Sequence, residues 1–96
     1  MGPLAIEVQL RGEAASALRH VGSKLDSALA ELVAMHAQLL QTEPGPARVT
    51  RVAEYRAKRA EVEHRKWMLI VQREAMGLSH HGEVDEVYPL PPPVRE

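Results

Sequence analysis

The fold of this chain is decided by residues 18–39, which read LRHVGSKLDSALAELVAMHAQL. Apolar side chains recur there in alternating steps of three and four residues, and they form a heptad stripe. This spacing places all of them on one side of an α-helix, where they pack against another helix. The stripe consists of Leu18, Val21, Leu25, Ala28, Leu32, Met35 and Leu39.

We predict that this helix occupies residues 1–41, although residues 3–12 leave two alternatives open. Four apolar residues in this segment alternate with other residues, as in a β-strand, yet two of them also continue the helical stripe. We favour the helix because no second strand follows in the sequence to pair with this one. The alternating residues are Leu4, Ile6, Val8 and Leu10.

A turn is predicted at residues 42–46, which read TEPGP. A proline disfavours helical backbone in the residue before it, so the first helix ends here. So short a connection makes the next helix an antiparallel neighbour of the first. We expect that second helix over residues 47–77, with Gly77 as its stop.

The second helix has one predicted apolar face, assuming about 100° of rotation per residue. Charged side chains at Arg56, Glu63 and Glu74 lie at the edge of this face. Charges in that position are typical of salt bridges across a helix interface. The apolar positions are Val49, Val52, Ala53, Ala57, Ala60, Trp67, Ile70 and Val71.

The C-terminal part predicts a short helix over residues 79–88 and an extended, proline-rich tail over 89–96. Ser79 is a suitable N-cap for the short helix. The tail has two interpretations. It is either a strap that packs Leu90 and Val94 on the hairpin, or a ligand for the aromatic groove of another protein.

Composition indicates a small core. The 96 residues include 13 Ala, no Phe and one Trp, so the helices bury little apolar area for their length. We therefore predict one all-α domain over 1–96, a helical hairpin that completes a bundle as a homodimer or higher oligomer. The absence of Cys excludes disulfides and thiolate chemistry. No membrane-length apolar run and no signal pattern is visible, so we expect a cytoplasmic location.

Charge is unevenly distributed along the chain. Residues 1–45 carry three basic and five acidic groups, residues 46–78 eight and four, and residues 79–96 one and four. A basic middle between acidic flanks favours pairing between helices over binding to nucleic acid, which typically requires a strongly basic domain. A nucleic-acid site would use Arg51, Arg59, Arg65, Lys66 and Arg73.

Residues 71–78 read VQREAMGL and are followed by Tyr88 and Pro89. This pattern resembles a family of small uncharacterised bacterial helical proteins, whose helical region ends in VQREA-x-GL before a tyrosine and a proline. The resemblance covers most of the chain. It implies a helical fold and no particular activity.

Residues 61–64 contain Glu-x-x-His, a spacing that places a carboxylate and an imidazole on adjacent turns of a helix. That pair is similar to the repeating unit of ferritin-like di-iron sites. The chain is similar in plan to encapsulated ferritins, two-helix proteins whose metal site forms between two hairpins. The resemblance implies Glu31, Glu61 and His64 as iron ligands, doubled across a dimer axis.

We therefore expect a non-enzymatic protein that acts through protein–protein association, as an oligomer or an adaptor, without a cofactor. The alternative is a ferritin-like di-iron oxidase or iron store. The residues expected at the interface are Leu25, Leu32, Met35, Leu39, Trp67 and Ile70.

Overall fold

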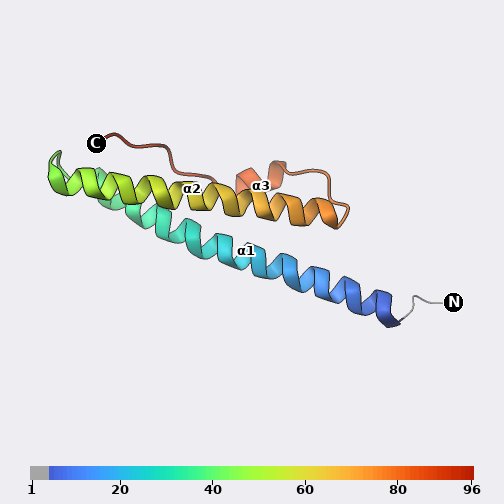
Figure 1. Ribbon diagram of the computed structural model, residues 1–96. Helices are drawn as coiled ribbons and strands as arrows, with labels where there is room; N and C mark the ends of the chain where they lie inside the picture. The colour runs from blue at the N-terminus through green and yellow to red at the C-terminus, as the bar shows by residue number, and fades with distance from the viewer. Residues whose placement is uncertain (1–4) are drawn as a thin grey trace.

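The computed structural model describes the backbone of residues 5–96 and the side chains of residues 12–96. It contains the helices α1 (Ala5–Leu40), α2 (Pro46–Ala75) and α3 (Gly82–Val87), and no strand in the described part. Helices α1 and α2 form an antiparallel hairpin, which gives a rod of 68 × 20 × 15 Å (Figure 1). The predicted all-α hairpin with a short third helix is confirmed.

The N-terminal segment is helical from Ala5, and α1 continues without a break through Gly12 and Gly22. The strand alternative is therefore wrong for residues 5–12, and residues 1–4 lie outside the described part. Residues 13–96 contain no strand that could accept the backbone hydrogen bonds of this segment, whereas a helix satisfies them within itself. Local alternation was too short a pattern to outweigh the continuous heptad stripe.

The turn between α1 and α2 is fastened by Arg48. Its guanidinium donates hydrogen bonds to the carbonyl oxygens of Leu39, in the last turn of α1, and of Thr42, in the turn itself. Pro46 begins α2, where its missing N–H costs nothing and its fixed φ suits a first turn. Pro46 and the arginine two residues later thus explain why α2 starts at once and runs antiparallel.

The core is a single line of apolar side chains between the helices. From α1 it takes the predicted heptad stripe: four members are buried and three are partly buried. From α2 it takes Val52, Tyr55, Val62 and Leu69, which we call the inner stripe. Val84 of α3 completes it.

The face of α2 that packs on α1 is not the predicted one. Of the eight apolar positions expected there, only Val52 is buried, Ile70 is partly buried, and the other six are exposed. The inner stripe instead uses Tyr55, Val62 and Leu69, whose bulky side chains fill the groove beside α1. Alanine cannot fill that space, so the alanine-rich side of α2 faces outward.

Helix α2 ends at Ala75, two residues before the predicted end at residue 77, and Gly77 lies just beyond the C-cap residue Met76. Gly77 has φ +84°, and the N–H groups of Gly77 and Leu78 donate to the carbonyls of Glu74 and Arg73. This is a glycine C-cap, as the sequence predicted. The guanidinium of Arg73 also donates to the carbonyl oxygen of His80, 2.9 Å away.

Helix α3 is shorter than predicted, covering residues 82–87 in place of 79–88. Ser79 lies in the extended connection, and the N-cap position belongs to His81. The bond from Arg73 to the carbonyl oxygen of His80 holds the backbone of this connection against α2, and α3 begins only at Gly82.

The proline-rich tail folds back along α2 toward the turn (Figure 1). Its backbone carbonyls accept hydrogen bonds from α2: Pro92 from the Tyr55 hydroxyl at 2.7 Å, and Pro91 from the Arg59 Nε at 2.9 Å. Leu90 and Val94 are partly buried against the core. The strap interpretation of the tail is confirmed.

Candidate functional site

The outward side of α2 carries a second apolar stripe, distinct from the inner stripe. Its members follow one another at intervals of three or four residues, and all of them are exposed. They therefore lie on one face of the helix over about 33 Å, at a rise of about 1.5 Å per residue. This outer stripe consists of Val49, Ala53, Ala57, Ala60, His64, Trp67 and Val71.

Trp67 dominates the outer stripe. It is the only tryptophan of the chain, and 59% of it is exposed. Its indole stacks on the imidazole of His64, with ring centroids 5.8 Å apart and an interplanar angle of 23°. Val49 and Val71, near the two ends of the stripe, are 45% and 42% exposed. An exposed row of this kind on a rigid helix is typical of an interaction surface.

Residues 12–96, whose side chains are described, leave this face uncovered because they pack on the other sides of α2. Helix α1 covers the inner stripe. The tail and α3 lie at one edge of that stripe. Arg59 binds the tail at the Pro91 carbonyl oxygen, and Lys66 binds α3 at Asp85, 3.0 Å away. The outer stripe lies across the helix from these contacts.

Most residues predicted for the interface are used inside the chain. Leu25, Leu32 and Leu39 are 0–2% exposed in the hairpin core, and Met35 and Ile70 pack against that core. A folded chain thus offers none of the three leucines to a partner. Of the predicted set, Trp67 is the residue that remains on the surface.

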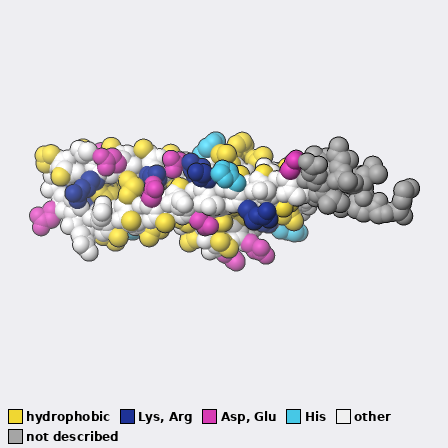
Figure 2. Space-filling model, turned by 90° about the horizontal axis from the view of Figure 1, so that it is seen from below, with side chains coloured by type: hydrophobic (Ala, Val, Ile, Leu, Met, Phe, Trp, Pro, Cys, Tyr) yellow, Lys and Arg dark blue, Asp and Glu magenta, His cyan; other side chains and the backbone are white. Residues whose placement is uncertain are grey.

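The basic side chains of α2 make bonds within the chain. Arg59 binds Glu63 at 3.1 Å as well as the tail. The other four basic residues predicted for a nucleic-acid site also bind within the chain: Arg51 to Thr42, Arg65 to Glu61, Lys66 to Asp85, and Arg73 to His80. On the face of the molecule seen in Figure 2, basic and acidic side chains are interspersed along the rod, and no large basic patch is visible.

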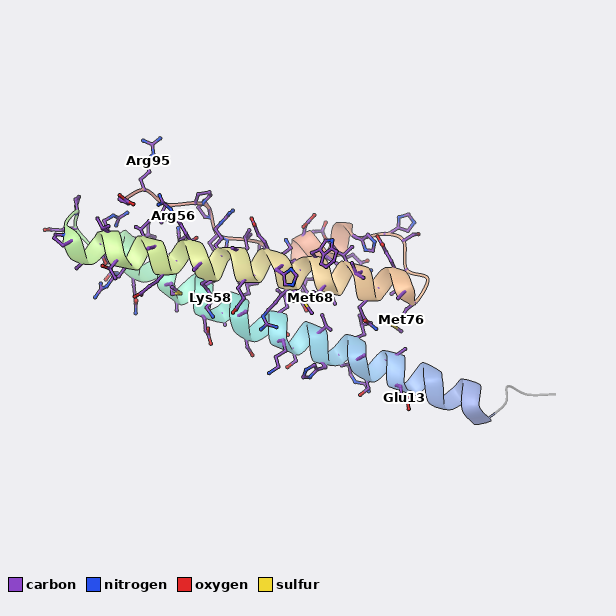
Figure 3. The ribbon with its side chains drawn as sticks, in the orientation of Figure 1. Glu13, Arg56, Lys58, Met68, Met76 and Arg95 are labelled. Carbon is purple, nitrogen blue, oxygen red and sulfur yellow. The ribbon has the colours of Figure 1, made fainter. Side chains whose placement is uncertain are left out.

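The proposed iron ligands are not brought together in the chain. Lys58 lies on the side of α2 that faces α1 (Figure 3), and its ammonium binds Glu31 at 2.6 Å and Glu61 at 3.3 Å. His64 lies on the outer stripe against Trp67. The two carboxylates thus surround an ammonium group, and the described residues contain no group of three or more potential metal ligands.

The ion pair between Glu31 and Lys58 shifts both groups. The hydrogen bond from Lys58 and its positive charge lower the pKa of Glu31 below its ordinary value of 4.5. The bond to Glu31 raises the pKa of Lys58 above 10.5, although burial opposes this. Both groups are charged near neutral pH, so this cluster fastens α1 to α2.

A groove of about 410 Å³ opens where α1, α2 and α3 meet. Its walls include Leu18 and Leu69, and the Tyr88 hydroxyl lies near Asp26. Burial raises the pKa of Tyr88, and the negative charge of Asp26 raises it further. The groove thus carries a neutral phenol. No local sequence pattern indicates this groove, because three separate elements form its walls.

No family model, curated protein or solved structure matches this chain. Among the described residues, no helix has the length and apolarity needed to cross a membrane.

Proposed function

We propose that this protein is a non-enzymatic helical protein that acts through protein–protein association, with the outer stripe of α2 as its contact surface. The observation that carries the proposal is the 59% exposure of Trp67, the only tryptophan of the chain, on the outward side of α2. Burying an exposed aromatic side chain of this size is a large gain for any helix that docks there.

Two further features support the outer stripe. Its backbone belongs to a continuous helix of 30 residues, so docking orders few groups that are not already ordered. Its alanines allow a partner helix to approach closely, and the charges of Arg56 and Glu63 lie beside it. We place this association in the cytoplasm, in keeping with the expectation from the sequence.

The experiment compares two exposed apolar residues. Trp67→Asp places a charge in the outer stripe, and Val87→Asp places one on α3 at a residue that is 64% exposed. Each variant and the wild type are immobilised and tested for stoichiometric binding to purified proteins, the free chain included. Circular dichroism checks that each variant folds.

We expect the wild type and Val87→Asp to bind a protein that Trp67→Asp does not bind. Both variants should keep the helical content of the wild type, because both residues lie outside the core. Equal binding by all three proteins would refute the outer stripe as the contact surface.

A further inference from the structure

We propose that the partner of the outer stripe is a second copy of this chain, packed antiparallel with a two-fold axis beside Ala60. The inference rests on the proposed function, because it names the occupant of the same surface. It follows from three properties of α2: the spacing of the stripe, the sizes of the residues that would meet, and the charges beside them.

The spacing of the outer stripe is nearly the same in both directions from Ala60. Val49 lies eleven residues before it and Val71 eleven after; Ala53 lies seven before and Trp67 seven after. In an antiparallel pair of identical helices, residues at equal distances from the axis face each other. Five members of the stripe therefore meet a copy of the stripe in register, and Ala57 and His64, three residues before Ala60 and four after it, face each other with an offset of one residue.

The facing residues also match in size. Trp67 would lie against Ala53 of the second copy, and this large-on-small contact occurs twice by symmetry. Ala60 would lie against Ala60 of the second copy, where the absence of a longer side chain lets the helix axes approach closely. Val49 and Val71 would close the two ends.

The charges beside the stripe distinguish the antiparallel arrangement from a parallel one. Arg56 and Glu63 lie on the same edge of the stripe, four residues before and three residues after Ala60. An antiparallel pair brings each within about 1.5 Å, along the helix axis, of the opposite charge on the second copy. In a parallel pair, the two-fold axis runs along the helices, so the edge with Arg56 and Glu63 lies on opposite sides of the interface in the two copies and these pairs do not form.

Both charged groups are accessible for such a contact. The side chain of Arg56 is 56% exposed and that of Glu63 is 55% exposed. Arg56 points to the edge of α2 near the tail, as Figure 3 shows, where it binds Glu96 and donates to the Val94 carbonyl oxygen, both at 3.4 Å. Glu63 binds Arg59 of its own helix at 3.1 Å. Surface pairs of this kind are weak, so Arg56 and Glu63 can turn toward a second copy at little cost.

The other edge of the stripe does not oppose the pairing. Glu61 lies near the proposed axis and would approach Glu61 of the second copy, but Lys58 and Arg65 of its own chain neutralise it.

The first test uses exchanged charges. Arg56→Glu alone gives two Glu–Glu contacts in its homodimer, and Glu63→Arg alone gives two Arg–Arg contacts. A mixture of the two variants gives a heterodimer in which both contacts are opposite in charge. We expect each variant to dimerise at least about tenfold more weakly than the wild type, and the mixture to recover the wild-type affinity.

The second test uses the absence of cysteine from the chain. Ala60→Cys places one thiol beside the two-fold axis, so oxidation should link two copies. Ala34→Cys, at an exposed position on α1, is the matched control and should stay unlinked. Sedimentation over about 5–500 µM covers the affinity expected for a small interface and gives the mass in solution.

The outcomes separate this inference from the proposed function. A wild-type chain that stays monomeric at every concentration overturns the second copy as partner, while Trp67-dependent binding to another protein leaves the proposed function standing. A dimer without recovery in the mixture, or without a disulfide at Ala60→Cys, overturns the antiparallel arrangement. If neither self-association nor binding depends on Trp67, both proposals fail together.

Discussion

The two apolar stripes of α2 both recur with the period of a helix, but they differ in their side chains. The inner stripe consists of leucine, tyrosine and valine, and its members are 0–6% exposed. The outer stripe consists of three alanines, two valines, His64 and Trp67, and it is exposed throughout. Periodicity thus indicates which residues share a face, whereas the fit of the side chains into the groove beside α1 decides which face packs within the chain.

The largest expected effect compares one residue from each stripe of α2. Leu69→Ala removes a side chain that is 6% exposed, so it loses apolar burial and leaves a cavity. We expect the free energy of unfolding to fall by about 2–5 kcal/mol. Trp67→Ala truncates a side chain that is 59% exposed and should change it by less than about 0.5 kcal/mol.

Urea unfolding measures both values. It should be followed by circular dichroism and not by tryptophan fluorescence, because Trp67→Ala removes the only tryptophan of the chain. The protein should be dilute, so that association adds nothing to the unfolding free energy. Equal losses in the two variants would mean that Trp67 stabilises the single chain, and the distinction between the stripes would not hold.

Much of the hairpin was predictable because α1 has one apolar stripe and no competitor. Leu25, Leu32 and Leu39 could only point toward another helix, and they are buried there. The turn was equally clear, since two prolines and a glycine leave few conformations for residues 42–46.

The packed face of α2 was harder to predict because two faces compete. Tyr55 has a polar hydroxyl, which makes it a poor candidate for the core until Pro92 appears as its hydrogen-bond acceptor. That acceptor lies 37 residues further along the chain, beyond the reach of any local pattern. The same competition affects the candidate site, because Trp67 was predicted from the sequence as an interface residue but only the fold shows that it faces outward.

The next effect concerns the bond that fixes the tail to the inner stripe. Tyr55→Phe removes the hydroxyl that donates to the Pro92 carbonyl at 2.7 Å and keeps the aromatic ring in the core. We expect a loss of about 1 kcal/mol in the free energy of unfolding, the usual value for one such bond. Urea unfolding measures it.

Thr50→Ala is the control for Tyr55→Phe, because its hydroxyl makes an exposed, longer bond to Pro46 at 3.3 Å. It should cost less than Tyr55→Phe. Neither change touches the outer stripe, so association should be the same as in the wild type. An altered affinity in Tyr55→Phe would show that the tail takes part in the contact.

A gain in stability is expected from Gly22→Ala. Gly22 lies in the middle of α1, and an added Cβ would lie 3.7 Å from the Tyr88 hydroxyl oxygen, an ordinary contact distance. The added methyl group raises helix propensity, so we expect about 0.5–1 kcal/mol of extra stability.

Gly77→Ala should instead destabilise the protein, because φ +84° strains any residue with a Cβ. Thermal unfolding distinguishes the two; a loss in Gly22→Ala would mean that α1 needs closer contact with Tyr88 there.

The smallest effect tests the rim of the inner stripe, where Glu31 binds Lys58 at 2.6 Å. The pKa of Glu31 is lower in the folded chain than its ordinary value of 4.5, so folding favours the charged form. The stability that this pair provides is present above that ordinary value, and it is lost as the pH falls through the lowered pKa.

Glu31→Gln should be slightly less stable than the wild type at pH 7, and the two proteins should become equally stable in strong acid. Because the Glu31 side chain is 61% exposed, added salt should reduce the difference at pH 7. A difference that persists in acid would show that Glu31 stabilises the hairpin through packing, and the rim would then belong with the inner stripe.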